Sequence, residues 1–327
     1  MRIVISEDTN KFYRAELLSI DPDMEIIPLN PEDSSNPSWD KVPESDAFFM
    51  SYQFLFAARD FPEIFDSLLS LTKRMKFIQS GFAGMDAPIL QEVLKEKDIL
   101  IANASSIYAI PIAHYVFSQI LRWNKRIDQH IDLQQSKTWT PLGGDGELTD
   151  KTLVILGYGG IGKEVAKLGK AFGMKVTGIR RNPVDDDYAD EVLGLDSFEE
   201  LLPLTDYLVL ALPDSSKTRD IINQDVLKKL NNSAMLVNVG RGTAINEQDL
   251  SDALNDKEIA AAALDTTKIE PLENSSPLWS TPNCFISAHD SAHSLLSIPR
   301  AFSLFAENIK NIKNGDQIVN LYSEKRE

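Results

Sequence analysis

The sequence is poor in features that whole classes of protein depend on. It has one cysteine, Cys284, in 327 residues, which excludes an internal disulfide and a cysteine-based metal cluster. Its longest apolar run is about six residues, around positions 207–212, whereas a membrane-spanning helix needs ~20. The first residues, MRIVISED, lack the apolar core of a signal peptide and predict a first β-strand. These absences favour a cytoplasmic protein with no membrane partner.

Positive charge is also scarce. The chain has 33 Lys and Arg against 49 Asp and Glu, a net charge of −16, and no run of four basic residues. Such a surface repels phosphate backbones and anionic lipids, so we expect no nucleic-acid partner. We interpret the acidity as a contribution to solubility. The 43% of apolar residues is ordinary for a globular protein and excludes disorder along the whole chain.

Short apolar runs alternate with stretches of helical periodicity, which is typical of βαβ units and a parallel sheet. The length suggests about two domains. The first series has expected strands at 3–6, 47–50, 77–79 and 99–102 and expected helices at 61–72 and 88–95. The second has expected strands at 153–156, 175–179, 207–211, 234–239, 260–264 and 284–287, an expected helix at 162–172, and a last helix at 298–312.

One long helix and two loops complete the expected elements. Residues 108–129 carry apolar side chains near helical spacing, and Pro111 is tolerated there in a first turn. Segments 31–43 and 140–146 are rich in turn-forming residues, so both are predicted to be loops.

The most informative stretch is TLVILGYGGIGKEVAKLGKAFGMKVTGIRR, residues 152–181. A strand, a glycine turn, a helix and a second strand follow one another, which is the context that a dinucleotide-binding motif requires. The glycines allow a tight turn, a close approach of backbone to pyrophosphate, and close packing of helix on strand. Backbone N–H groups at the positive end of the helix dipole would face the phosphates. The predicted cofactor-binding residues of this turn are Gly157, Tyr158, Gly159, Gly160, Ile161 and Gly162, and the alternative is a purely structural glycine turn.

The end of the second strand predicts the choice of cofactor. NAD enzymes usually place Asp or Glu there to accept hydrogen bonds from the ribose hydroxyls. This chain has Arg180 and Arg181 instead, with no carboxylate before Asp185. A guanidinium pairs well with a 2′-phosphate, so we predict that NADP(H) is preferred over NAD(H). The alternative is that the two arginines only form a solvated strand end.

Polar side chains follow three later strands, at the edge where open α/β sheets bind ligands. Arg241 follows the strand in LVNVGRGTAINEQDL, and His289 follows the strand in NCFISAHDSAHS. Asp265 and Glu270 come after the strand in AAALDTTKIEPL. Taken singly, Arg241 is better explained as a surface ion-pair partner. The alternatives are a loop acid for Glu270 and a packed core histidine for His289.

In this combination and order, the motifs GYGGIG, LALPDSSKT, NVGRG, LDTTKIEPL and the His of SAHDSA resemble those of the D-isomer-specific 2-hydroxyacid dehydrogenases. That family includes glyoxylate/hydroxypyruvate reductases and D-lactate dehydrogenase, and the resemblance is clearest at 81–86 and 103–320. It implies an α/β fold of two doubly wound parallel-sheet domains, with a Rossmann cofactor domain inserted in a smaller flavodoxin-like substrate domain. We place the substrate-binding domain at 1–104 plus 295–327 and the dinucleotide-binding domain at 105–294.

The resemblance implies a catalytic set. Arg241 would bind the 2-oxo group and carboxylate of the substrate, His289 would donate a proton, and Glu270 would hold and tune His289. Reduction of a carbonyl leaves negative charge on oxygen and needs a proton donor that titrates near neutrality, which is the range of histidine. A neighbouring carboxylate raises the pKa of an imidazole. Arginine stays charged and matches a carboxylate in geometry.

Further residues gain roles only through the resemblance. Asp265 would contact the nicotinamide carboxamide, and Val239 and Gly240 would border the nicotinamide. The loop along the cofactor would contain Leu212, Pro213 and Thr218. In the glycine loop QSGFAGMD, the N–H groups of Ala83 and Gly84 would bind the substrate carboxylate, with Ser51 and Tyr52 lining the same pocket or serving as ordinary loop residues. Trp139 lies in an arm that commonly packs on a second subunit, so a homodimer is expected.

Several positions depart from the family pattern. Ala288 and Asp290 flank His289 where the family usually has Pro and small residues, and Asp290 either points into solvent or perturbs His289. His114 stands where Glu is common, and Lys268 replaces a frequent acid or apolar residue.

The predicted function is NADPH-dependent reduction of a small 2-oxoacid (glyoxylate, hydroxypyruvate or a branched 2-ketoacid) to a D-2-hydroxyacid. The alternatives are a dinucleotide-sensing, corepressor-like protein without turnover, and a dehydrogenase of another small anion such as phosphite or formate; no metal is expected.

Overall fold

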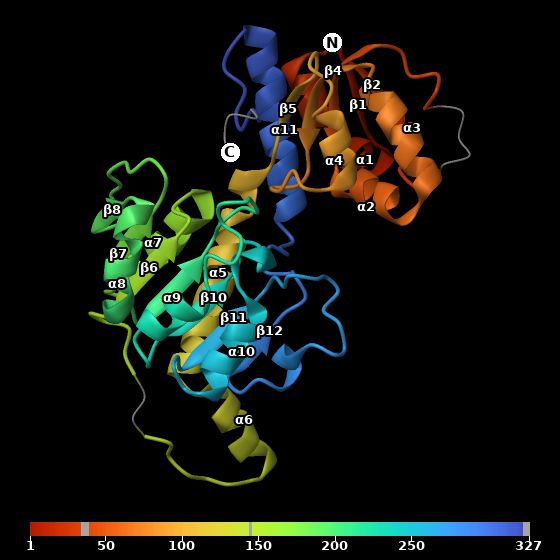
Figure 1. Ribbon diagram of the computed structural model, residues 1–327. Coiled ribbons are helices and arrows are strands. Elements are labelled where there is room, and N and C mark those ends of the chain that lie inside the picture. The colour runs from red at the N-terminus through yellow and green to blue at the C-terminus, as the bar shows by residue number, and fades with distance from the viewer. Residues whose placement is uncertain (34–38, 144–145, 323–327) are drawn as a thin grey trace. The chain divides into compact units, whose positions relative to one another are not determined.

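The computed structural model describes residues 1–33, 39–143 and 146–322, and the chain divides into two compact units (Figure 1). The first unit contains Met1–Tyr108 and Ser294–Glu327, and the second contains Ala109–His293. Each unit is built on its own parallel sheet, so the expected α/β fold with two parallel-sheet domains is confirmed. Parts of the two predicted loops, 34–38 and 144–145, lie outside the described residues.

The first unit holds a five-stranded parallel sheet in the order β2-β1-β3-β4-β5, the strand order of flavodoxin-like folds. The strands are β1 Arg2–Ser6, β2 Glu25–Leu29, β3 Ser45–Met50, β4 Met75–Ser80 and β5 Leu100–Ala102. The helices are α1 Glu7–Ile20, α2 Tyr52–Asp60, α3 Pro62–Thr72, α4 Pro88–Val93 and α11 Ser297–Asn314, with a short 3-10 turn η1 at Ser105–Ile107.

Alternation along the strands sends side chains to opposite faces of this sheet. On β1, Ile3 and Ile5 pack with residues of α1 and α11, whereas Val4 packs with residues of α2, α3 and α4. Phe49 of β3 stacks on Phe305 of α11 with ring centroids 5.1 Å apart. Because both faces are covered, the central strands β1, β3 and β4 are largely buried.

The second unit holds a seven-stranded parallel sheet in the order β12-β11-β10-β9-β6-β7-β8, which is the strand order 3-2-1-4-5-6 of dinucleotide-binding folds with one strand added. The strands are β6 Thr152–Leu156, β7 Lys175–Ile179, β8 Glu191–Leu193, β9 Tyr207–Leu210, β10 Met235–Asn238, β11 Ala261–Leu264 and β12 Cys284–Ile286. The helices are α5 Ala109–Asn124, α6 Ile127–Gln135, α7 Gly160–Ala171, α8 Phe198–Leu201, α9 Gln224–Lys229 and α10 Glu247–Asn255. Short 3-10 turns lie at η2 Leu195–Ser197, η3 Leu202–Leu204, η4 Gly242–Ala244 and η5 Pro277–Ser280.

Close packing holds α7 against the sheet. A Cβ atom on Gly169 would lie 2.7 Å from Leu153 of β6 and 3.0 Å from Val176 of β7. Phe117 of α5 stacks on Phe172, just after α7, at 5.2 Å between ring centroids. The helix therefore lies hard against the strands that flank the glycine turn.

The helix predicted at 108–129 is confirmed as far as Asn124 and is wrong only near its end, where the chain breaks before a second helix. The helix α5 ends at Asn124, and a separate helix α6 begins at Ile127. Arg126 between them has φ +51°, a left-handed conformation that a right-handed helix cannot contain. Pro111 is the third residue of α5, within the first turn as expected.

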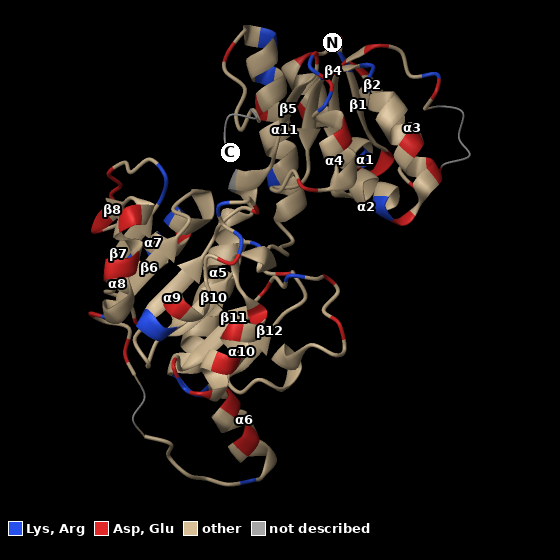
Figure 2. Ribbon diagram, viewed as in Figure 1, with Lys and Arg blue, Asp and Glu red and all other residues tan. Residues whose placement is uncertain are grey.

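Acidic residues occur in both units, for example in α3 and α10 (Figure 2). The net charge of −16 follows from 49 acidic against 33 basic residues. Within the described ranges, no helix combines the length and the apolar character that crossing a membrane requires.

Candidate active site

The glycine turn has the shape that a phosphate group needs. Gly157 has φ +106°, and a Cβ atom there would lie 2.5 Å from the carbonyl oxygen of Ala211. Among the described residues, and apart from the backbone next to each glycine, no atom lies within 4 Å of a Cβ built on Gly159 or Gly160, so open space lies over the backbone at the start of α7. A Cβ atom on Gly162 would lie 2.8 Å from the carbonyl oxygen of Gly157 and 3.1 Å from the side chain of Ile155 in β6, and the latter is the close helix-to-strand approach that the motif requires. These residues fit a dinucleotide pyrophosphate.

The strand order places this turn at a topological switch point. In the sheet β6 lies between β7 and β9, and ligands of open α/β sheets bind at such a point, beyond the carboxyl ends of the strands. After β9, Thr218 donates through Oγ1 to the carbonyl oxygen of Pro213 at 2.8 Å. A Cβ atom on Gly240 would lie 2.6 Å from the amide nitrogen of Leu212. The predicted loop after β9 and the end of β10 are therefore in contact at this edge.

Tyr158 differs from the other residues of the glycine turn. Its side chain is 1% exposed, its ring lies where a Cβ on Gly178 would approach to 2.3 Å, and its hydroxyl donates to Asp186 at 3.0 Å. The Tyr158 side chain thus packs and hydrogen-bonds within the protein, and Tyr158 contributes its backbone to the turn. Arg180 and Arg181 directly follow β7, and Arg181 is exposed.

His289 and Glu270 form a direct pair. The Nδ1 atom of His289 lies 2.8 Å from Oε2 of Glu270, and both side chains are half-buried. The hydrogen bond to Glu270, reinforced by the negative charge of that carboxylate, raises the pKa of His289 against the opposing effects of burial and of Arg241. The imidazolium form is therefore favoured.

Glu270 is itself held by its own loop. Its Oε1 accepts from the backbone N–H of Thr267 at 3.1 Å. Burial acts to raise the pKa of Glu270, but the hydrogen bond to His289, the charge of His289, the Thr267 N–H and the charge of Arg241 together lower it. Glu270 is thus ionised beside a histidine that favours its own charged form.

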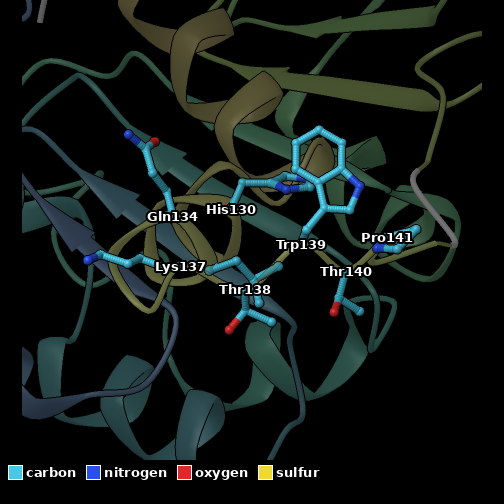
Figure 3. Close-up of a pocket in the computed structure, with 8 residues that line it drawn as sticks. His130, Gln134, Lys137, Thr138, Trp139, Thr140 and Pro141 are labelled. Atoms are coloured by element: carbon cyan, nitrogen blue, oxygen red, sulfur yellow. The ribbon is translucent and has the colours of Figure 1, made fainter.

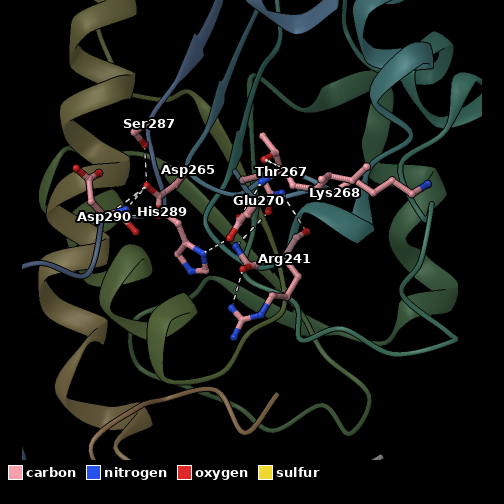
Figure 4. A network of polar contacts seen from close by, with 12 residues as sticks. Arg241, Asp265, Thr267, Lys268, Glu270, Ser287, His289 and Asp290 are labelled. Atoms are coloured by element: carbon pink, nitrogen blue, oxygen red, sulfur yellow. Dashed lines mark hydrogen bonds and ion pairs between the residues drawn. The ribbon is translucent and has the colours of Figure 1, made fainter. Parts of the chain in front are cut away.

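Arg241 follows β10 beside the same pair (Figure 4). Asn238 donates from Nδ2 to the backbone oxygen of Arg241 at 3.1 Å, and the Nη1 of Arg241 donates to the oxygen of Gly240 at 3.0 Å. Its charge lowers the pKa values of both Glu270 and His289. The structure therefore brings Arg241, Glu270 and His289 together, as the positions after neighbouring strands lead one to expect.

Asp265 supports the turn that carries His289. Its carboxylate is buried and accepts from Ser287 Oγ at 2.7 Å and from the backbone N–H groups of Asp290 at 3.0 Å and Ser291 at 3.1 Å. The N–H of His289, which has φ +54°, donates to the backbone oxygen of Asp265 at 2.8 Å. Both carboxylate oxygens already accept hydrogen bonds within the protein, so the structure gives Asp265 a role in fixing His289.

Tyr115 and Ser287 also belong to this arrangement, and the sequence did not predict them as site residues. The hydroxyl of Tyr115 on α5 lies 2.6 Å from Ser287 Oγ, so a chain of hydroxyls runs from α5 to the Asp265 carboxylate. Nothing in the local pattern around Tyr115 marks it as part of a site. Of the two possibilities for Asp290, the structure shows an exposed side chain that points away from His289 (Figure 4).

The predicted substrate-binding residues Ser51, Tyr52, Ala83 and Gly84 all belong to the first unit. Ser51 is buried just before α2, and its Oγ has no hydrogen-bond partner among the described residues. A Cβ atom on Gly81 would lie 3.0 Å from the amide nitrogen of Tyr52. The glycine loop and the start of α2 are therefore in contact within this unit.

A hollow of about 620 Å³ lies elsewhere, between α6 and the segment that follows it. Its lining includes His130, Lys137 and Trp139 (Figure 3), and it contains none of the predicted site residues. Trp139 is fully exposed.

The side chains that the structure describes include no group of three His, Cys, Asp or Glu arranged to hold a metal. Burial raises the pKa of Cys284 to about 12, which leaves its thiol protonated.

Comparison with known proteins assigns the family. Residues 117–291 match the family model of the NAD-binding domain of D-isomer-specific 2-hydroxyacid dehydrogenases. The chain is 32% identical to glyoxylate/hydroxypyruvate reductase A of Yersinia enterocolitica over 78% of its own length and 82% of that protein. A D-isomer-specific 2-hydroxyacid dehydrogenase family protein of Aeromonas salmonicida superposes with a TM-score of 0.81 at 27% identity, covering 98% of each chain. An NADPH-dependent glyoxylate/hydroxypyruvate reductase of Sinorhizobium meliloti shares the fold, with a TM-score of 0.75 at 22% identity over 98% of each chain. The chain therefore belongs to the D-isomer-specific 2-hydroxyacid dehydrogenases and is an NAD(P)-dependent oxidoreductase of that family.

Proposed function

We propose that the enzyme reduces a small 2-oxoacid to a D-2-hydroxyacid with NADPH as the preferred cofactor. The observation that carries the proposal is the arrangement of His289, Glu270 and Arg241: a carboxylate-supported imidazole beside a permanent cation. This pairs a proton donor with a group that binds a carboxylate and stabilises an alkoxide. Glyoxylate, hydroxypyruvate and branched 2-ketoacids are the candidate substrates, and the Yersinia relative is named for the first two.

The two ring nitrogens of His289 have different tasks. Because Nδ1 faces Glu270, Nε2 is the nitrogen that holds the proton for the substrate oxygen. Glu270 keeps the ring charged and oriented until that proton leaves. Arg241 binds the substrate carboxylate and steadies the negative charge that develops on the carbonyl oxygen. The nicotinamide, when bound, supplies the hydride chemistry.

The cofactor would be held by the glycine turn and the loops beside it. The open space over Gly159 and Gly160 would receive the pyrophosphate at the start of α7, and Leu212, Pro213, Thr218, Val239 and Gly240 would lie along the rest of the molecule. Arg180 and Arg181 would pair with the 2′-phosphate. Within the first unit, Ser51, Tyr52, Ala83 and Gly84 would contribute to substrate binding, with the orphaned hydroxyl of Ser51 as a donor.

The segment around Trp139 would contact a second copy of the chain. Trp139 is fully exposed, and Ile127 and Ile131 of α6 are 44% and 45% exposed. Apolar surface of this kind is typical of an interface. A homodimer by sedimentation equilibrium, weakened in Trp139→Ser, is the expected result, and a wild-type monomer at micromolar concentration would reject this part of the proposal.

The decisive experiment is a steady-state screen of cofactor oxidation over a panel of 2-oxoacids, with NADPH and NADH titrated separately. We expect His289→Ala and Arg241→Ala to abolish turnover while cofactor binding by calorimetry stays nearly intact. Full activity in either variant would refute the assigned roles. Tight cofactor binding with negligible turnover on every oxoacid would favour a regulatory protein, and tighter binding of NADH would overturn the cofactor preference.

A further inference from the structure

Three side chains form a cluster beside the glycine turn that the proposed chemistry does not use. The hydroxyl of Tyr158 donates to Oδ1 of Asp186 at 3.0 Å, and Nζ of Lys163 lies 2.5 Å from Oδ2 of the same carboxylate. The backbone N–H of Tyr188 donates to Oδ1 at 3.1 Å. We call Tyr158, Lys163 and Asp186 the clasp. Both oxygens of its carboxylate are occupied from inside the protein.

The clasp joins three segments at the carboxyl end of β7. Tyr158 belongs to the glycine turn and its ring covers Gly178 of β7, Lys163 lies in the first turn of α7, and Asp186 lies in the loop after β7. Arg180 is close enough for its charge to act on the Tyr158 hydroxyl. In dinucleotide-binding folds this end of the second strand is where the adenosine ribose is recognised.

Asp186 is an acid like the one that NAD enzymes use at this place to bind the ribose, but its carboxylate is buried and already paired. Its side chain is only 9% exposed, whereas that of Lys163 is 45% exposed. The ion pair with Lys163 keeps the pKa of Asp186 low, so the carboxylate is charged and its charge is balanced by one ammonium. A free carboxylate here would accept a hydrogen bond from a ribose hydroxyl and would repel a 2′-phosphate.

We propose that the clasp sets the cofactor preference by holding the Asp186 carboxylate inside the protein, so that the arginines after β7, and not an acid, meet the 2′-position of the ribose. Tyr158 and Lys163 are positioning residues that act through Asp186. The inference rests on the proposed preference for NADPH and explains how a chain with Asp186 in the loop after β7 can have that preference.

The test compares cofactor affinities of the full-length protein by calorimetry, without substrate. The quantity is the ratio of the NADH to the NADPH dissociation constant, because any effect on the shared pyrophosphate cancels in that ratio. Lys163→Met releases a charged Asp186, and we expect the ratio to fall about tenfold, or about 1.4 kcal/mol. Tyr158→Phe removes one hydrogen bond without changing a charge, and we expect a smaller fall of about two- to threefold.

The double variant Lys163→Met with Asp186→Asn identifies the cause. It has the same net charge as the wild-type pair and no carboxylate to release, so we expect the ratio to return to within about threefold of wild type. If the double variant stays as low as Lys163→Met, Lys163 binds the 2′-phosphate directly and the proposal is overturned. An unchanged ratio in both Lys163→Met and Tyr158→Phe would also overturn it.

The wild-type measurement separates the two levels of inference. Tighter binding of NADH by the wild type would overturn the proposed cofactor preference, and with it the role of the clasp. A wild type that prefers NADPH, with variants that keep the same ratio, would reject the clasp alone. As a folding control, circular dichroism monitors the unfolding of the cofactor-free variants and of the wild type.

Discussion

The pair of His289 and Glu270 gives the sharpest test of the site, through the variant Glu270→Gln. The substitution keeps nearly the same shape and removes one charge. One of the two carboxylate oxygens that now accept, from His289 and from the Thr267 N–H, becomes an NH2 group that cannot accept a hydrogen bond. The variant therefore loses the charge and half of the polar support, with little change in volume.

The size of the effect follows from the contact. Two unit charges at the observed 2.8 Å attract by about 1.5 kcal/mol at the dielectric constant of water. The two side chains are 42% and 39% exposed, so screening and the cost of ordering them leave about 1 kcal/mol. That energy corresponds to about a fivefold lower ratio of imidazolium to imidazole.

The sign of the pH dependence follows from the roles. Reduction needs protonated His289, so kcat/KM falls as the pH rises through the pKa of His289, which Glu270 raises. In Glu270→Gln the fall begins at lower pH, and at pH 8 we expect about a fivefold additional loss of kcat/KM with an active 2-oxoacid. In the direction of hydroxyacid oxidation, the rising limb moves to lower pH.

An NMR titration and a control variant test whether the loss of kcat/KM arises from the pKa of His289. The chain has four histidines, so a proton NMR titration, with His289→Asn to assign the resonance, follows the ring directly and needs no substrate. Glu273→Gln removes an exposed acid of the same loop and serves as the matched control. A His289 titration in Glu270→Gln that coincides with wild type, or lies above it, would refute the electrostatic reasoning.

Three other predictions concern the glycines and the pair. Gly159→Ala adds a methyl group to open space, so the unfolding free energy of the cofactor-free protein should change by less than about 0.5 kcal/mol while the cofactor dissociation constant rises at least about tenfold; unchanged binding by calorimetry would contradict a pyrophosphate at this place. Gly242→Ala would put a Cβ atom 1.9 Å from the carbonyl carbon of Thr267, so urea denaturation should show a loss of about 3 kcal/mol or more, and near-wild-type stability would disprove the close approach. The pair of Glu270 and His289 adds stability that is present above the ordinary Glu pKa of 4.5 and below the ordinary His pKa of 6.5; it is lost as the pH falls through the lowered pKa of Glu270 or rises through the raised pKa of His289, so the stability gap between wild type and Glu270→Gln should be greatest between these values.

Much of the fold could be predicted because apolar runs and glycine turns are local signals. Strands buried on both faces, such as β6 and β10, stand out as short apolar runs between polar segments. The edge strands β2 and β8 were missed, because β2 contains Pro28 and an exposed glutamate and β8 has only three residues. The break between α5 and α6 was missed because the apolar spacing continues across Arg126, whose left-handed backbone has no signature in composition.

The candidate site divides in the same way. Arg241, Glu270 and His289 could be named because each comes shortly after an apolar run, and the ends of parallel strands meet at one edge. Tyr115 and Ser287 could not, because their hydrogen bond joins positions 172 residues apart. The inward orientation of the Tyr158 side chain likewise cannot be predicted from the motif GYGGIG, in which the following residues Gly159 and Gly160 face open space.

Local signals in the amino-acid sequence predict the two parallel sheets, the glycine turn and the identity of the polar groups after the strands, because local backbone geometry and burial leave strong patterns in composition. Which acidic side chains are already hydrogen-bonded within the protein depends instead on contacts between distant parts of the chain. Asp265 and Asp186 are both acids near expected ligand positions, yet each accepts its hydrogen bonds from within the protein. The reason is that a buried carboxylate must find donors wherever the fold brings them, and those donors come from distant parts of the chain.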